Sequence, residues 1–535
     1  MAAFNFKPTA FDSIDARATP LPSLPRRRES GFPSGWNLAR SNDVFRCAAT
    51  LALFIASSCA TVGPLAVAQS RQTTVELTPC TFARHKEAAL CGKHQVYENR
   101  EAKTGRKIAL NIVVLPARSS AAKTDPVFYL AGGPGQAAAR IASAGEDAIM
   151  RELRRERDLV FVDMRGTGDS NGLQCDFPAD PSKVQSFFGE FFELAVIQAC
   201  REKLERIADL KYYNTPLGVD DLEEVRLALG YDKINLYGVS HGSQATLEYL
   251  RRYPDAVRSA VLAGVATPAA KLPLQFAQGA EQAMTRLFED CAADDGCNTA
   301  FPQLMQRFAQ LMQSFDNGPV ELQVAHPATK AVQTATLSRG VFVVRLLALL
   351  YNHRTAGLLP LIIANAAQGD WSAFMKILAR SAAPPAFRVY LGAYLSATCS
   401  ESVPLIDDQA LVRATAHTFM GEYRTNRHQQ ACAHWPRGEI APHYYQPVRA
   451  ATAVLMLSGD IDPATPAAFG AQALETLPNG RQVVLRNTPH SYESSCARAL
   501  ILTFIASGSA TELDTRCAAR LRRPPFATEL PASYK

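Results

Sequence analysis

The segment Gly238-Val239-Ser240-His241-Gly242 constrains the fold of this chain more than any other stretch. An apolar run typical of a β-strand leads into it, and residues 244–253 have the pattern of a helix. Such a G-x-S-x-G turn, between a strand and a helix, lifts a serine hydroxyl above the sheet edge and places a helix N-terminus beneath it. The alternative is an ordinary turn flanked by glycines. The strand before it and the helix after it favour Ser240 as a nucleophile.

The residues around this turn alternate between buried strands and helices. Continuous apolar runs, typical of strands covered on both faces, occupy 126–130, 159–163, 234–239 and 259–264. Alternation of this kind predicts a mostly parallel sheet with helices on both faces. Two further buried strands are expected at 453–457 and 482–485. The predicted fold is therefore α/β, with the core of an α/β hydrolase.

Between these two groups of strands the pattern becomes largely helical, with long apolar helices expected at 276–291 and 339–351. An insertion of this size beside a catalytic turn is typical of a cap over the site. We accordingly expect four segments: a leader with a signal peptide at 1–68, the first part of the core at 69–265, a helical cap at 266–449 and the second part of the core at 450–535.

The N-terminus has the features of an export signal. Arg40 and Arg46 precede an apolar run at 47–60, and Ala66-Val67-Ala68 is an A-x-A cleavage sequence. A permanent membrane anchor is the alternative, but Gly63-Pro64 interrupts the run. A lipoprotein site at Cys59 is a weaker alternative. We expect an exported protein, periplasmic or secreted, without a stable membrane span in its mature form.

Charge and cysteine content agree with export and argue against other classes. Without residues 1–68 the formal charge is +3, too small to indicate a nucleic-acid or anionic-membrane partner. Ten cysteines remain, an even number that suggests disulfides in an exported chain. Because they fall into neighbouring pairs, the simplest prediction is Cys80–Cys91, Cys175–Cys200, Cys291–Cys297, Cys399–Cys432 and Cys496–Cys517. No cysteine or histidine cluster has the spacing of a zinc site.

A serine nucleophile needs a base and an acid that orients the base. In this fold the acid and then the histidine follow later strands, on loops at their C-terminal ends. His490 follows the predicted strand 482–485, and both Asp460 and Asp462 follow the strand 453–457. The proline after Asp462 fixes its turn and favours it as the orienting acid, whereas Asp460 is expected to hydrogen-bond within the loop.

Two further loops are expected near the nucleophile. The glycine-rich segment 132–135 follows the buried strand 126–130, where a second oxyanion donor is expected. We therefore predict an oxyanion hole made by the backbone N–H groups of His241 and Gly133. The segment 163–170 follows the next buried strand, and Asp163 and Arg165 are expected to brace it by hydrogen bonds to each other.

These motifs together resemble the prolyl- and tripeptidyl-aminopeptidase branch of the α/β-hydrolase superfamily, especially exported bacterial tripeptidyl-aminopeptidase-like enzymes. The likeness covers about residues 75–520. It implies a triad of Ser240, Asp462 and His490, and it selects Asp462 over Asp460. The matching pieces are Gly132-Gly133-Pro134-Gly135, Asp163-x-Arg165-Gly166-x-Gly168-x-Ser170, Gly238-x-Ser240-x-Gly242, Gly459-x-x-Asp462-Pro463-x-Thr465-Pro466, His490, Cys291…Cys297 and Thr398-Cys399-Ser400-Glu401.

Two departures from the prolyl-aminopeptidase pattern favour the tripeptidyl-like branch. Ala131 stands where those enzymes usually have histidine, and His241 stands where they have tryptophan. The resemblance also implies carboxylates that bind the substrate ammonium group. Glu401 is the first candidate and Glu281 the second, although each is equally compatible with an exposed or ion-paired glutamate.

The resemblance implies a serine hydrolase that cleaves peptide bonds near a free N-terminus through an acyl-enzyme on Ser240. An esterase or lipase-like hydrolase of small acyl esters is the alternative enzyme, and a catalytically silent binding protein is a third hypothesis. The expected partner is a peptide or small acyl substrate. No metal and no organic cofactor is implied.

Overall fold

The computed structural model describes residues 74–82, 85–176, 180, 182–326, 329–380 and 388–534. The proposed leader and signal peptide lie outside these residues. Within the described part, no helix has both the length and the apolar character that crossing a bilayer requires.

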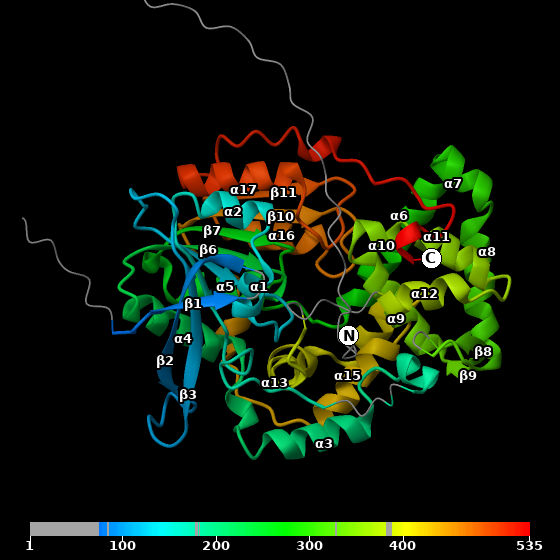
Figure 1. Cartoon of the computed structure of the whole chain (residues 1–535), viewed down its shortest axis with the longest axis horizontal. Helices are drawn as coiled ribbons and strands as arrows, with labels where there is room; N and C mark the ends of the chain where they lie inside the picture. The colour runs from blue at the N-terminus through cyan, green and yellow to red at the C-terminus, as the bar shows by residue number, and fades with distance from the viewer. Residues whose placement is uncertain are drawn as a thin grey trace, which may run out of the picture. The chain divides into compact units, whose positions relative to one another are not determined.

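A nine-stranded sheet forms the centre of the α/β core (Figure 1). Its first three strands pair antiparallel with their neighbours, and the other strands run parallel. The strands follow in the order β1 (Thr78–Phe82), β2 (His85–Tyr97), β3 (Lys107–Leu115), β5 (Leu159–Val162), β4 (Val127–Leu130), β6 (Ile234–Val239), β7 (Val257–Ala263), β10 (Ala453–Gly459) and β11 (Gly480–Leu485).

Side chains alternate between the two faces of the parallel strands, and both faces are buried. Val160 and Val162 of β5 pack into one apolar cluster, whereas Leu159 and Phe161 pack into another. Helices supply the other side of each cluster, as burial on both faces of a parallel sheet requires. The predicted α/β-hydrolase fold is therefore confirmed.

The core helices lie on both sides of the sheet (Figure 1). The first cluster takes in α3 (Leu194–Leu204), α4 (Thr215–Ala228), α5 (His241–Arg252) and α16 (Ala467–Leu474). The second takes in α1 (Ala138–Ala144), α2 (Ala148–Leu153) and α17 (Ser495–Ser507). This arrangement holds the start of α5, and therefore Ser240, against the middle of the sheet.

The cap has an apolar core of its own. Its helices are α6 (Gln275–Ala293), α7 (Asp295–Ala300), α8 (Leu304–Ser314), α9 (Arg339–Leu350), α10 (His353–Ala356), α11 (Leu359–Ala366) and α12 (Ser372–Arg380). A hairpin of β8 (Val320–Ala325) and β9 (Val332–Leu337) adds to them. Two later helices, α13 (Leu391–Glu401) and α15 (Tyr423–Ala433), contribute instead to the first core cluster, and α14 (Asp408–Thr415) packs near α6.

Five disulfides join the pairs of cysteines that the sequence predicted. Cys399–Cys432 ties α13 to α15 and encloses the longest loop, with a sequence separation of 33 residues. Cys291–Cys297 encloses the shortest, with a separation of 6. Each of the five disulfides therefore joins two cysteines that follow one another in the sequence, as the spacing predicted.

We expect the Cys399–Cys432 bridge to contribute more to stability than Cys291–Cys297. Closing a loop restricts the unfolded chain more when the loop is longer, which gives about 4 kcal/mol for the first bridge and about 2 kcal/mol for the second. Denaturant unfolding of the two variants in which both cysteines of one bridge become alanine measures the difference. A larger loss on removing Cys291–Cys297 would contradict this ranking.

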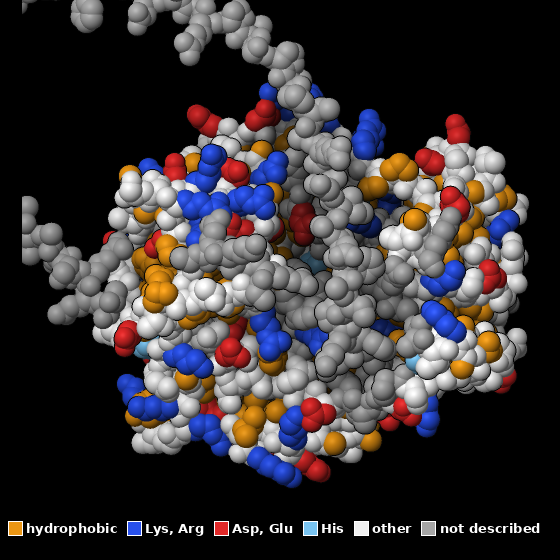
Figure 2. Space-filling model, in the orientation of Figure 1, with side chains coloured by type: hydrophobic (Ala, Val, Ile, Leu, Met, Phe, Trp, Pro, Cys, Tyr) orange, Lys and Arg blue, Asp and Glu red, His pale blue; other side chains and the backbone are white. Residues whose placement is uncertain are grey.

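On the face shown in Figure 2, Lys and Arg side chains are interspersed with Asp and Glu. Mixed charge of this kind produces no extended field of one sign. It agrees with the low net charge beyond residue 68, which gave no reason to expect a nucleic-acid partner.

Candidate active site

Ser240 lies in the strained turn between β6 and α5, with φ 57° and ψ −123°. A residue other than glycine adopts such a conformation only where its surroundings enforce it. The two flanking glycines are required by close packing: a Cβ on Gly238 would lie 2.3 Å from the carbonyl oxygen of Gly242, and one on Gly242 would lie 2.0 Å from that of Leu130. The sequence motif therefore corresponds to a turn that larger residues cannot form.

Asp462 and His490 meet on the loops after β10 and β11. Oδ2 of Asp462 lies 2.7 Å from Nδ1 of His490. The aspartate is almost fully buried and also accepts hydrogen bonds from Tyr492 Oη at 2.7 Å and from the Thr465 hydroxyl at 2.8 Å. Burial by itself raises its pKa, but the charge of His490 and these hydrogen bonds outweigh burial and hold the pKa of Asp462 below its usual value.

Asp460 occupies a different position. It is exposed, and its carboxylate accepts a hydrogen bond from the backbone N–H of Thr488 at 3.2 Å. Of the two aspartates that the sequence left in competition, Asp462 is the one that reaches the imidazole. Asp460 was expected to hydrogen-bond within its own loop, but its carboxylate instead joins this loop to the one after β11 that bears His490.

The imidazole of His490 lies beside the end of the strand that supports Ser240. The Ser240 N–H donates to the carbonyl of Ala263 at 2.8 Å, and Gly264 follows directly. A Cβ on Gly264 would lie 2.9 Å from Cε1 of His490. Because Nδ1 faces Asp462, Nε2 is turned away from the aspartate. No direct hydrogen bond joins Nε2 to the Ser240 hydroxyl within the part of the chain that the structure describes, and such contacts often tighten only when substrate binds.

Two tyrosines enclose His490. The ring of Tyr351, at the C-terminal end of cap helix α9, lies 5.1 Å from the imidazole, centroid to centroid, in an edge-to-face arrangement. The ring of Tyr492 lies 6.2 Å away. The sequence contained no signal for Tyr351, since it comes from the insertion and reaches the site only when the cap folds over the core.

The predicted oxyanion donors lie next to the nucleophile. His241 is the first residue of α5, where backbone N–H groups have no partner inside the helix. The glycine-rich loop is held beside Ser240 because β4 pairs with β6, and a Cβ on Gly132 would lie 3.1 Å from Cβ of Ser240. Among the backbone hydrogen bonds of the described residues, the N–H groups of His241 and Gly133 have no acceptor.

The side chain of His241 is buried behind this loop. Its Nε2 lies 2.9 Å from the hydroxyl of Thr215, the first residue of α4. Burial lowers the pKa of His241 to about 4, so the imidazole is neutral at physiological pH. Its position agrees with the expectation that its backbone, and not its ring, faces the reacting group.

Glu401, the first candidate for binding a substrate amine, is the last residue of α13. It is 1% exposed, and donors from within the protein contact both of its oxygens. Oε1 accepts the backbone N–H of Thr215 at 2.7 Å, and Oε2 accepts from the hydroxyls of Thr215 and Tyr444 and from Nε2 of Gln244 at 2.9, 2.8 and 3.2 Å. Burial raises the pKa of Glu401 to about 7.

Glu281, the second candidate, is half-buried on α6 of the cap. Its Oε2 accepts the backbone N–H of Phe419 at 2.8 Å. The same helix packs on the acid loop, since a Cβ on Gly279 would lie 2.5 Å from the carbonyl oxygen of Pro463. Glu281 therefore stands on an element that borders the site.

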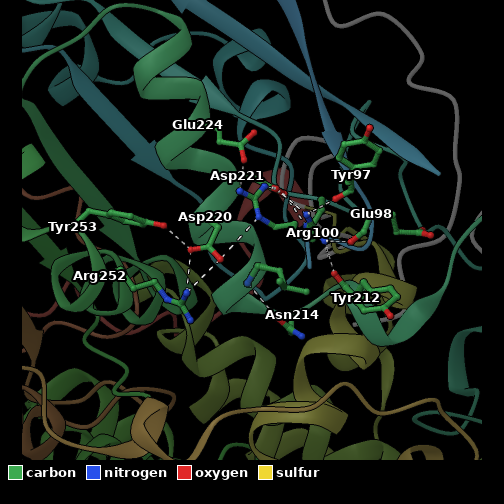
Figure 3. Close-up of polar contacts among 12 residues, drawn as sticks. Tyr97, Glu98, Arg100, Tyr212, Asn214, Asp220, Asp221, Glu224, Arg252 and Tyr253 are labelled. Atoms are coloured by element: carbon green, nitrogen blue, oxygen red, sulfur yellow. Dashed lines mark hydrogen bonds and ion pairs between the residues drawn. The ribbon is translucent and has the colours of Figure 1, made fainter. Parts of the chain in front are cut away.

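The predicted hydrogen bond between Asp163 and Arg165 is wrong. Asp163 accepts instead from Asn111 and from the backbone of Ala139 and Asp169, whereas Arg165 donates to both oxygens of Asp221. Asp221 also binds Arg100, at the centre of the ion-pair network in Figure 3. Both residues brace the loop. Asp163 does so partly within it, through Asp169, whereas Arg165 pairs with Asp221, 56 residues away.

Residues 417–517, which include Asp462 and His490, match the family model described as TAP-like protein. The chain is 24% identical to serine protease Hip1 of Mycobacterium tuberculosis over 528 residues, 90% of this chain and all of that protein. It is 29% identical to tripeptidyl aminopeptidase of Streptomyces lividans over 155 residues, 26% of this chain and 28% of that one.

Among solved structures, proline iminopeptidase of Mycobacterium smegmatis superposes with a TM-score of 0.33 at 16% identity, over 78% of this chain and 98% of that one. The predicted resemblance to the prolyl- and tripeptidyl-aminopeptidase branch is confirmed by the family model and the sequence relatives.

Proposed function

We propose that this chain, an α/β hydrolase similar to the tripeptidyl-aminopeptidase branch, is a serine peptidase that cleaves peptide bonds near a free N-terminus. The observation that carries the proposal is the strained turn of Ser240 after β6 together with the Asp462–His490 pair on the loops after β10 and β11, at the C-terminal edge of one sheet. The similarity to a serine protease and to a tripeptidyl aminopeptidase supports peptide substrates.

In this mechanism Ser240 attacks the substrate carbonyl while Nε2 of His490 takes its proton. Asp462 holds the ring with Nδ1–H toward itself and stabilises the imidazolium that forms. The imidazolium then donates its proton to the leaving amine, which departs from the acyl-enzyme. Water, activated by the same imidazole, releases the acyl group and restores the hydroxyl.

The tetrahedral oxyanion is bound by the N–H groups of His241 and Gly133. Each donor of this kind contributes about 3 kcal/mol to lowering the barrier. The start of α5 adds the partial positive charge of a helix N-terminus at the same point. These groups are fixed by the backbone, so they require little reorganisation as charge develops.

We propose Glu281, in preference to Glu401, as the carboxylate that binds the substrate ammonium group. Glu281 has one oxygen engaged by Phe419 and stands on the cap helix that borders the acid loop. Glu401 has four internal donors and is buried. An ammonium group could reach it only by displacing some of them.

We expect Glu281→Gln to raise KM for free-N-terminal tripeptide amides about tenfold, the effect of losing about 1.4 kcal/mol of binding. The rate of labelling by a fluorophosphonate should be unchanged, because this reagent carries no ammonium group. Steady-state kinetics on the amides and labelling rates of the same two proteins measure the difference. An equal effect on both would contradict an amine-binding role.

The experiment that tests the function is a panel of aminoacyl, prolyl, dipeptidyl and tripeptidyl amides, each with a free and an acetylated N-terminus, beside small acyl esters. An aminopeptidase loses its substrates on acetylation. An esterase or lipase-like hydrolase keeps the esters and ignores the N-terminus. A catalytically silent binding protein hydrolyses none of them and does not react with a fluorophosphonate.

We also propose that the protein is exported, to the periplasm or beyond. Five disulfides in the described part of the chain support an oxidising compartment. N-terminal sequencing of the mature protein should begin at Gln69, after the A-x-A sequence. A mature protein that retains residues 1–68 would contradict this cleavage site.

A further inference from the structure

A buried network of polar side chains lies next to the proposed oxyanion hole, and the mechanism above assigns no role to these side chains. It joins Glu401, at the end of α13, to the first turns of α4 and α5. Its members are hydrogen-bonded to one another and buried: Thr215, His241, Gln244, Glu401 and Tyr444. Buried groups of this kind are costly unless every partner is in place, so their arrangement is closely determined.

The direction of each hydrogen bond follows from the donors and acceptors available. When Glu401 is ionised, above its pKa of about 7, its carboxylate only accepts, so the single proton of the Thr215 hydroxyl goes to Oε2 of Glu401. The same hydroxyl must then accept from His241, which assigns the proton of the neutral imidazole to Nε2. Glu401 thereby determines the orientation of the ring through Thr215.

Glu401 also acts on the backbone of both helices. It accepts the backbone N–H of Thr215, one of the N–H groups that the first turn of α4 leaves unpaired. Through Gln244 it contacts α5 one turn after His241. One carboxylate therefore holds the start of α4 against the start of α5.

This connection bears on catalysis because Ser240 is strained. A residue at φ 57° and ψ −123° keeps that conformation only while the elements on both sides are held. On the β-sheet side, the Ser240 N–H donates to Ala263. On the helix side, the ring of His241 and its contact with Thr215 hold the residue whose N–H faces the oxyanion.

The surroundings leave space for this residue to move if the contact is lost. A cavity of about 30 Å³ is lined by Gly132, Gln136, Thr215 and His241, among others. Without the Thr215 hydroxyl, the imidazole has no acceptor on that side and has room to turn. Small displacements of an oxyanion donor reduce the stabilisation of the transition state.

We propose that Glu401 and Thr215 are positioning residues of the oxyanion hole, which act through the side chain of His241. The proposal rests on the proposed acyl-enzyme chemistry at Ser240, but not on the identity of the substrate. The sequence suggested a different role for Glu401, at a substrate amine, and the experiments below distinguish the two roles.

The test compares Thr215→Val, which removes the hydroxyl at nearly constant volume, with Thr215→Ser, which keeps it. For a tripeptide p-nitroanilide with a free N-terminus, we expect Thr215→Val to lower kcat at least tenfold with KM within twofold of wild type. Thr215→Ser should stay within about threefold of wild type in both constants. Loss of one whole oxyanion donor lowers kcat about 10²–10³-fold, and this is the upper limit that we expect for the effect of Thr215→Val.

The second readout is the rate of covalent labelling by a fluorophosphonate. This reagent needs the Ser240 nucleophile and the oxyanion hole but no ammonium site, so it remains informative whichever substrates the enzyme hydrolyses. Labelling of Thr215→Val should slow by about the same factor as kcat. A wild-type protein that is not labelled would disprove the proposed function itself, independently of the network.

Glu401→Gln should reproduce the Thr215→Val effect, and the double variant should be no slower than the slower single one, since both act through His241. Glu223→Gln is the matched control. It alters another carboxylate, on α4, that accepts from the hydroxyl of Tyr249, and it should leave kcat and labelling unchanged. Thermal unfolding checks that each variant is folded.

Two results would overturn the proposal. One is a folded Thr215→Val variant with the kcat and labelling rate of wild type. The other is a Glu401→Gln variant in which only KM rises and only for substrates with a free N-terminus, which would assign Glu401 to the substrate amine.

Discussion

Replacing Ser240 by alanine is expected to lower kcat about 10⁶-fold for every substrate of this enzyme while the protein remains folded. The loss is this large because the serine forms the covalent bond, and the oxyanion hole and substrate binding alone recover only a small part of the acceleration. The fold should persist because alanine keeps the Cβ. The backbone strain at this position therefore stays the same.

Hydrolysis of the preferred amide, fluorophosphonate labelling and thermal unfolding together check this prediction. Ser259→Ala is the matched control, since its buried hydroxyl donates to Asn235 within the same sheet. It should lower stability by about 1 kcal/mol and leave kcat unchanged. A purified Ser240→Ala protein with substantial turnover would assign the nucleophile to another residue.

Replacing Asp462 by asparagine is expected to lower kcat about 10⁴-fold with little change in KM. The carboxylate accepts from Nδ1 of His490 at 2.7 Å, whereas an amide can turn its N–H₂ group toward that nitrogen and favour the wrong tautomer. Four internal donors, from Ala464, Thr465 and Tyr492, also meet the carboxylate, and an amide cannot accept all of them.

Asp460→Asn provides the control within the same loop. Asp460 is exposed and accepts one backbone N–H, so its variant should retain kcat within about threefold. Steady-state kinetics of the two variants on one substrate decide between the aspartates. If Asp460→Asn lowered kcat more than Asp462→Asn, the acid that orients His490 would be Asp460, and the choice of Asp462 would be wrong.

The depressed pKa of Asp462 also has a consequence for stability. Since the folded state holds this carboxylate below its usual pKa, it contributes stability at pH values above the ordinary pKa of aspartate. The contribution is lost as the pH falls through the lower folded value. Asp462→Asn removes it, so the difference in stability between the variant and the wild type should narrow in acid.

Features defined by neighbouring residues were predictable from the sequence. The turn around Ser240 follows from two glycines at fixed spacing after an apolar strand. The positions of Asp462 and His490 follow from the strands that precede them. The disulfides follow from cysteines that are near one another in the chain.

Other features depended on segments that are distant in sequence. Arg165 pairs with Asp221, 56 residues away, and not with the nearby Asp163. Tyr351 reaches His490 only because the cap covers the core. Glu401 has a motif compatible with several roles, and only the structure shows its contact with Thr215, 186 residues away at the start of α4.

The kind of fold, the turn at Ser240 and the loops that bear Asp462 and His490 were thus predictable from local patterns. Strand periodicity, glycine spacing and proline act over a few residues, and they have the same effect wherever the segment lies. Which buried donor meets which acceptor was not predictable in this way. That choice depends on how helices and loops pack on the finished sheet, because a buried polar group takes whichever partner the packing brings within about 3 Å.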